Sequence, residues 1–206
     1  TIKLVSTSDD STRFRNTNAS IATAKNWNWS GKAVTTVGTF NCEYPVMDYY
    51  IGIKTKKDVV LPFYQINVNA GRAVLIKDGN FDTTIIVSSG DRIAAFNYKT
   101  KTDSITVFGD IRRFYISSTN ANITGLDANH MPYMNHLDLN NANVTYLNIY
   151  NCSNLEWLRV NDHRLKTIDL RKMGKLKTVY LSGSSSAATR TLTSALISNS
   201  SLNCFW

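Results

Sequence analysis

The feature of this sequence that most constrains its fold is an apolar pattern that returns every 21 residues between Arg112 and Ser182. Six registers keep this spacing: Ile123/Val144/Leu165, Leu126/Leu147/Ile168, Met131/Cys152/Met173, Met134/Leu155/Leu176, Leu137/Leu158/Val179 and Leu139/Val160/Leu181. A repeat of about 20 to 30 residues is typical of a solenoid, in which each repeat forms one coil and equivalent residues stack on the coil before. The pattern therefore predicts a solenoid over this stretch.

Within each repeat the apolar residues follow the phrase L-x-x-L-x-L, as in Met134-x-x-Leu137-x-Leu139. The last two positions of the phrase are expected to point inward from a short strand. A second half, Val144-x-x-Leu147-x-Ile149, follows the first. In this arrangement the sequence resembles the short leucine-rich repeats that are common in surface proteins of gut Bacteroidetes and in phages that infect them.

The chain departs from that family at its asparagine position, where Ala142, His163 and Ser184 stand instead. We therefore expect an internal asparagine ladder to be absent, or shifted to Asn141 and Asp162.

The two ends of the solenoid are predicted to be irregular, as terminal coils must seal the stack. Phe114 and Ile116 match Leu137 and Leu139 at a spacing of 23 rather than 21, which indicates a two-residue insertion in the first coil. After the last coil, Leu192, Leu196 and Ile197 follow a helix-like spacing within residues 187–198. With a closing strand in residues 201–206, this segment is predicted to form the C-terminal cap.

The chain before the repeats reads as β structure. Residues 1–44 contain short β segments, with the two indoles of Trp27-Asn28-Trp29 either in a small β core or in an exposed aromatic platform. Residues 45–110 contain short apolar runs at close spacing, separated by turns such as Lys77-Asp78-Gly79-Asn80, which favours an antiparallel β-sandwich. This order of strands and turns resembles the PKD-like, immunoglobulin-type domain that precedes such repeats in Bacteroidetes-type proteins.

The prediction is thus a mostly β chain in four segments. They are an N-terminal β segment at 1–44 for anchoring or oligomerisation, a PKD-like sandwich at 45–110, a leucine-rich-repeat solenoid at 111–186 and a C-terminal cap at 187–206. The Gly109-Asp110 junction runs directly into the first coil, so the sandwich and the solenoid are expected to share a rigid interface.

Charge and cysteine content bound the class of protein. The net charge of +8 is spread over both halves of the chain, and one basic cluster lies in the last full coil. Its members are Arg159, Arg164, Lys166, Arg171, Lys172, Lys175 and Lys177. They form either a solvated face or a contact for an acidic partner or polyanion. No nucleic-acid-binding motif accompanies them, so no nucleic-acid partner is expected.

The three cysteines, Cys42, Cys152 and Cys204, form no paired framework, and Cys152 shares a register with two methionines, which predicts a buried apolar role. This usage favours assembly in a reducing cytoplasm over a disulfide-stabilised secreted protein. No run of about 20 apolar residues predicts a membrane span. The first residues are too short and too polar for a secretory signal.

The sequence contains no pattern that points to catalysis or to a cofactor. His130, His136 and His163 lack metal-ligand spacing, and no nucleophile-elbow motif is present. Three turn aspartates, Asp78, Asp82 and Asp91, follow no calcium-loop consensus. We therefore expect no enzyme activity, no metal and no cofactor.

The strand faces of the solenoid carry the candidate site. Residues between the inward leucines form two outward columns, Tyr115/Asp138/Arg159/Tyr180 and Arg113/His136/Trp157/Thr178. The coil spacing of about 4.8 Å allows Asp138 and Arg159 to pair. Aromatic and arginine side chains are enriched where proteins bind other proteins, and aromatic rings also stack on sugars. Tyr115, His136, Asp138, Trp157, Arg159 and Tyr180 are therefore the candidate partner-binding residues, against the alternative of a well-packed β surface.

These features predict a non-enzymatic structural or recognition protein on an exterior surface. The first candidate is a phage virion component, such as a capsid decoration, fibre or tail protein, which the missing signal and unpaired cysteines favour. The alternative is a bacterial adhesin or glycan-binding lipoprotein at the cell surface (outer membrane) or secreted. The expected partners are other protein subunits or a host-surface glycan or protein, in a homo-oligomer or a larger assembly.

Overall fold

The computed structural model describes residues 45–68, 73–86, 92–117, 122–140, 142–183, 192–198, 202 and 204–205. They belong to one compact unit of the chain, Tyr44–Trp206. Throughout these ranges the regular structure is strand, with no helix, which confirms the prediction of a mostly β protein. The segment predicted at 1–44, with its tryptophan pair, lies outside the described residues.

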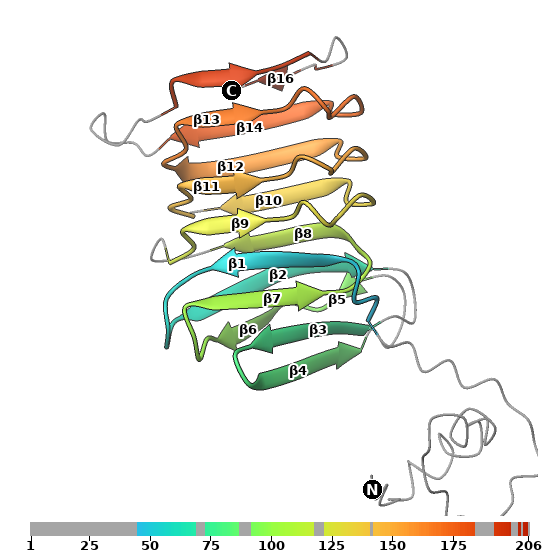
Figure 1. Cartoon of the computed structure of the whole chain (residues 1–206), viewed down its shortest axis with the longest axis vertical. Coiled ribbons are helices and arrows are strands. Elements are labelled where there is room, and N and C mark those ends of the chain that lie inside the picture. Colours follow the sequence, from blue (N-terminus) through green and yellow to red (C-terminus); the bar gives the residue numbers. More distant parts are fainter. Residues whose placement is uncertain are drawn as a thin grey trace, which may run out of the picture. The chain divides into compact units, whose positions relative to one another are not determined.

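The strands are named in chain order in Figure 1. The first eight are β1 (Tyr50–Lys54), β2 (Val60–Val68), β3 (Ala73–Asp78), β4 (Phe81–Ile86), β5 (Arg92–Ile93), β6 (Phe96–Lys99), β7 (Ser104–Phe108) and β8 (Ile111–Ser117). The rest are β9 (Gly125–Asp127), β10 (His136–Asn140), β11 (Tyr146–Asn148), β12 (Trp157–His163), β13 (Thr167–Asp169), β14 (Thr178–Gly183), β15 (Ser194–Leu196) and β16 (Cys204–Phe205).

Two main sheets run through the unit (Figure 1). One has the order β11-β9-β1-β7-β3-β4, and the other β16-β14-β12-β10-β8-β2-β5, with β6 also paired to β2. Pairing is parallel between coils, as in β8–β10–β12–β14. It becomes antiparallel where β8 meets β2 and where β9 meets β1. Both sheets therefore continue from the coils into the strands that precede them in the sequence.

The registers confirm the 21-residue solenoid. Leu137 lies opposite Leu158 on one side and Phe114 on the other, so the first step has the 23-residue spacing that the sequence predicted. Five of the six predicted ladders consist wholly of buried residues, and in the sixth Leu147 is partly buried. Strand alternation sends these side chains inward from both sheets, so they form one core that runs from Ile51 to Leu181.

A tight turn in the antiparallel part depends on glycine. Gly79, with φ of 63°, is the first central residue of the hairpin between β3 and β4, where a positive φ at this position alone is the pattern of a type II′ turn. Asp78 before it is fully buried, and its carboxylate accepts hydrogen bonds from the Tyr98 and Thr102 hydroxyls at 3.1 and 2.6 Å. These bonds tie the hairpin to the second sheet through β6.

The C-terminal cap differs from the prediction. The helix-like spacing within residues 187–198 was misleading, because Ser194–Leu196 is strand β15 and pairs in parallel with β13. The Lys166 carbonyl accepts hydrogen bonds from the Thr193 amide and hydroxyl, so the backbone extends the previous coil and gains ladder hydrogen bonds. The closing strand is confirmed by β16, which pairs with β14.

The predicted ladder of Asn141 and Asp162 stays a prediction, because Asn141 lies outside the described residues. Asp162 has a φ of 57° beside a register shift in β12. A polar ladder among the described residues lies one position earlier. Asn161 donates to Asn140 at 3.2 Å and accepts from the Ser182 hydroxyl at 2.8 Å. Ala142 and His163, which stand where the similar repeats carry asparagine, are buried and face the core instead.

Candidate functional site

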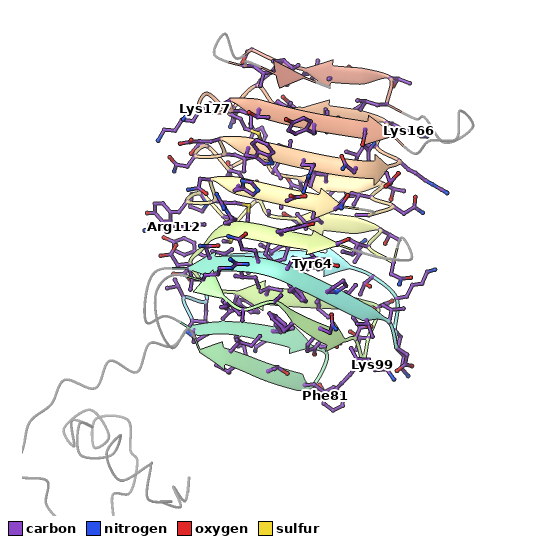
Figure 2. All side chains as sticks on the ribbon, turned by 180° about the vertical axis from the view of Figure 1, so that it is seen from behind. Tyr64, Phe81, Lys99, Arg112, Lys166 and Lys177 are labelled. Atoms are coloured by element: carbon purple, nitrogen blue, oxygen red, sulfur yellow. The ribbon has the colours of Figure 1, made fainter. Side chains whose placement is uncertain are left out.

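The outward side of β8, β10, β12 and β14 carries the predicted binding residues. We call it the coil face and define it by Arg113, Tyr115, His136, Asp138, Trp157, Arg159, Thr178 and Tyr180. The strand registers confirm both predicted columns, since His136 lies between Arg113 and Trp157, and Arg159 lies between Asp138 and Tyr180. Figure 2 views the molecule from this side, with Tyr64 of β2 beside the coils.

An ion pair joins the second and third strands of the coil face. Arg159 Nε donates to Asp138 Oδ1 at 2.8 Å, and a second guanidinium nitrogen donates to Oδ2, so the contact is bidentate. Asp138 is only 4% exposed, and burial raises the pKa of its carboxyl group, while the guanidinium opposes that rise. The carboxylate in turn raises the pKa of Arg159. The predicted pairing is confirmed, and its role is to neutralise a buried charge.

Three rings stack along the coils beside this pair. His136 and Trp157 are nearly parallel, with centroids 5.4 Å apart, and the Tyr180 ring lies 5.1 Å from Trp157. Burial, followed by the charges of Arg113 and Arg159, lowers the pKa of His136 to about 4. The imidazole is therefore neutral at pH 7. The Trp157 Nε1 group is buried and has no hydrogen-bond partner in the part of the chain that the structure describes.

A second stack begins with a residue that the sequence did not indicate. Tyr64 packs on Tyr115 with ring centroids 5.0 Å apart, and the Arg159 guanidinium lies 5.7 Å from the Tyr115 ring. A register shift in β2 between Phe63 and Gln65 accommodates Tyr64 there, where it is 41% exposed. No periodicity could reveal this contact, because β2 and β8 are distant in sequence and pair through an irregular register.

The six predicted residues thus share one face, but their rings mostly cover one another. Tyr64 stacks on Tyr115 and His136 on Trp157, while Tyr180 meets Trp157 at an interplanar angle of 51°, so part of the ring surface is used within the fold. Stacking on a sugar requires a free ring face, whereas protein contacts use edges, hydroxyl groups and arginine equally well. The arrangement is chemically better suited to contact with another protein.

The other two histidines have contacts within the fold. His130 stacks on Tyr50 at 4.1 Å. Buried His163 accepts a hydrogen bond from the Leu165 amide at Nδ1, while its Nε2 has no partner among the described residues. Within the described ranges, no three His, Cys, Asp or Glu side chains gather as metal ligands. Asp91 lies outside those ranges. No helix among the described residues is long and apolar enough to cross a membrane.

Cys152 is a buried free thiol, as its register with methionines predicted. Its Sγ donates to the Ala128 carbonyl at 3.1 Å, and burial raises its pKa to about 12. Cys42 and the side chain of Cys204 lie outside the description.

The basic cluster predicted in the last coil is divided by the fold. Arg159 belongs to the coil face, and Figure 2 places Lys166 and Lys177 on opposite edges of the molecule. Arg171 pairs with Asp169 and Lys177 with Glu156, each at 2.7 Å. Lys175 donates to the Asn154 side chain at 2.6 Å, and Lys172 lies 3.7 Å from the centre of the Tyr150 ring.

No protein-family model, curated protein or solved structure matches this chain.

Proposed function

We propose that this chain is a non-enzymatic structural and recognition protein of an exterior surface, most specifically a phage virion component that contacts another protein subunit through the coil face. The observation that carries the proposal is the pairing of Asp138 with Arg159 among the stacked rings of the same face. Arginine and aromatic side chains dominate the energy of protein interfaces. Holding them in place before binding lowers the entropy that association costs.

The chemistry of the coil face also supports a role without catalysis. The groups that could act as acid, base or nucleophile there are engaged in the fold: the Asp138 carboxylate is held by Arg159, and the His136 ring by Trp157. A reaction would need such a group to be released toward a substrate. The free thiol of Cys152 is compatible with assembly in a reducing compartment before display.

A bacterial adhesin is the second candidate, and one observation favours it. Tyr64, beside the coil face, is the outermost ring of its stack and is 41% exposed, so it offers a platform to a sugar. The resemblance to repeats of Bacteroidetes surface proteins points to the same setting.

Peptide mass spectrometry of two fractions from the source culture separates the candidates. Stoichiometric enrichment in density-purified virus particles is expected for the virion component. Enrichment in washed outer membranes instead would overturn that assignment in favour of the adhesin.

Site-specific photo-crosslinking then tests the coil face from its neighbour Tyr64, which packs on Tyr115 of that face. A benzoylphenylalanine at position 64 is expected to crosslink to one virion protein in purified particles. The matched control is position 146, because Tyr146 is also an exposed tyrosine, at 49%, but stands on a strand of the other sheet. Equal crosslinking from both positions would contradict a specific contact at the coil face.

A further inference from the structure

Three turns of the same backbone structure form one edge of the solenoid, at residues 128–135, 149–156 and 170–177. Each turn begins with an Asx contact, in which Asp127, Asn148 or Asp169 accepts a hydrogen bond from the amide two residues later. Each then repeats two backbone bonds three residues apart, as in Met173 to Leu170 and Leu176 to Met173, both 3.1 Å. The edge is therefore regular, and equivalent side chains lie one coil apart.

The third turn, residues 170–177, differs from the other two in charge. It carries four cations: Arg171, Lys172, Lys175 and Lys177. The first turn contains no lysine, arginine or carboxylate, and the only charged residue of the second is the anion Glu156. Two carboxylates, Asp169 and Glu156, pair with Arg171 and Lys177. Four cations less the two carboxylates that pair with them leave two positive charges at the third turn.

Neutral groups hold the other two lysines in place. Lys172 rests on the Tyr150 ring, and Lys175 donates to the Asn154 side chain of the coil before. Both lysines remain exposed. A neutral partner positions an ammonium group without cancelling its charge, so both can attract an anion. Lys175 also acts on Glu156 and Lys172 on Asp169, and these two carboxylates are already included in the charge sum.

Gly174 leaves open space between these lysines. A Cβ atom added there would meet nothing within 4 Å, and its φ is not in the left-handed region. The equivalent positions in the earlier coils are Pro132 and Ser153, so side-chain bulk decreases toward the third turn. A ligand can therefore approach the backbone where Lys172 and Lys175 flank it.

We propose that the third turn, whose lysines are positioned by Tyr150 and Asn154, binds the carboxylate or sulfate groups of an acidic polysaccharide. Asn154 itself is held by its donation to the Pro132 carbonyl at 2.7 Å and serves to position Lys175. Lysine is depleted in protein–protein interfaces, and this edge offers amides, hydroxyls, a ring and cations in place of an apolar centre. Such groups match the hydroxyls and charges of an acidic sugar chain. The site lies on a turn edge, apart from the coil face of the proposed function, and each can fail without the other.

Binding of the full chain to four immobilised polymers tests the proposal by biolayer interferometry. Polygalacturonate presents carboxylates and heparin presents sulfates, while dextran is the neutral control and poly-L-glutamate represents an acidic protein. We expect binding to at least one acidic polysaccharide at 0.15 M salt, tighter than to poly-L-glutamate, and none to dextran. The arm that binds identifies which anion is preferred.

Two substitutions at Gly174 test the site most directly. Gly174→Glu places a carboxylate between the lysines and is expected to weaken binding by about tenfold or more. Gly174→Ser copies the preceding coil and is expected to leave the affinity within about twofold. Thermal unfolding identical to wild type shows that both variants are folded.

A charge-matched pair completes the test. Lys172→Gln with Lys175→Gln should weaken binding by at least about fivefold, whereas Arg164→Gln with Lys166→Gln removes equal charge from the same coil and should change it less than about twofold. If both double variants lose the same affinity, the binding comes from diffuse charge attraction and the proposed site is wrong. Equal or tighter binding to poly-L-glutamate, or no binding to either polysaccharide, would also overturn it.

Discussion

At the scale of single residues, Asp138 depends on its partner. Its carboxylate is 4% exposed and receives both hydrogen bonds of the Arg159 guanidinium. Replacing Arg159 with Met leaves a buried charge without a counter-ion, so we expect the free energy of unfolding to fall by about 2 kcal/mol. Urea unfolding at pH 7 measures this change.

The control for that variant uses an exposed pair. Lys177→Met breaks the ion pair with Glu156, which water screens, and should leave the urea midpoint nearly unchanged. A double variant, Asp138→Asn with Arg159→Met, removes both charges and should recover part of the lost stability. If Arg159→Met costs no more than Lys177→Met, the pair does not stabilise the fold.

The lowered pKa of His136 should make the free energy of unfolding depend on pH. Its pKa is lowered from 6.5 to about 4 in the folded chain, so between these values the unfolded chain binds a proton that the folded chain refuses. The free energy of unfolding should therefore fall as the pH drops from 6.5 toward 4. At pH 5 these two pKa values correspond to about 2 kcal/mol, and because water screens this half-buried ring we expect a loss of about 1 kcal/mol from this group.

His136→Gln provides the comparison. The variant should lose less stability than wild type between pH 7 and pH 5 in urea unfolding, while the buried His163, whose pKa is also lowered, keeps a residual slope in both proteins. Parallel pH profiles would contradict the assignment to His136.

At the scale of elements, Gly109 lets the chain pass from one sheet to the other. It lies between β7 and β8 with φ of 145°, and an added Cβ would lie 3.2 Å from the Ala73 carbonyl oxygen and 3.3 Å from Val74 Cγ2. Gly109→Ala is expected to lower the free energy of unfolding by about 2 kcal/mol, because both the dihedral and the contact are unfavourable. Thermal and urea unfolding measure the effect.

Gly52 is the matched control for this substitution. It lies within β1, its φ is ordinary, and its nearest neighbours to an added Cβ are at 3.8 and 3.9 Å. Gly52→Ala should therefore be close to neutral. If both substitutions lower the free energy of unfolding equally, the backbone conformation of Gly109 does not require glycine.

The strands of the coils differ in how deeply they are packed. Leu158 of β12 is fully buried, whereas Leu147 of β11 is only partly buried. Leu158→Ala should lower the free energy of unfolding by about 3 kcal/mol through the cavity it leaves, and Leu147→Ala by clearly less. The reverse order in urea unfolding would contradict the burial that the structure assigns.

At the scale of the whole molecule, the two main sheets and their single core cross residue 110 without interruption. We therefore expect the antiparallel strands and the coils to unfold together. Hydrogen exchange followed by mass spectrometry should give peptides from β2, β8 and β10 the same free energy of opening. Opening of β10 at a clearly lower free energy would instead indicate two independent units.

The sequence predicted features that follow from regular spacing, but not contacts between residues that lie far apart in the chain. The coil columns, the first-coil insertion and the buried Cys152 follow from spacing alone, because parallel coils repeat one geometry. The cap at Leu192–Ile197 could not be assigned in this way, since three apolar residues fit a helix or a strand equally and the hydrogen bonds to the Lys166 carbonyl decide. The contact of Tyr64 with Tyr115 could not be predicted, because β2 and β8 are neighbours in the sheet but distant in the sequence.

The sequence by itself determined the repeat, the inward residues and which side chains share the coil face, since a period of 21 residues leaves one way to stack equivalent positions. The tertiary structure alone decided what those side chains do there. It turned the rings onto one another, buried the Asp138 carboxylate against Arg159 and distributed one run of basic residues over separate surfaces. Periodicity describes which residues are neighbours, whereas burial, orientation and charge pairing arise only when both sheets close on one core.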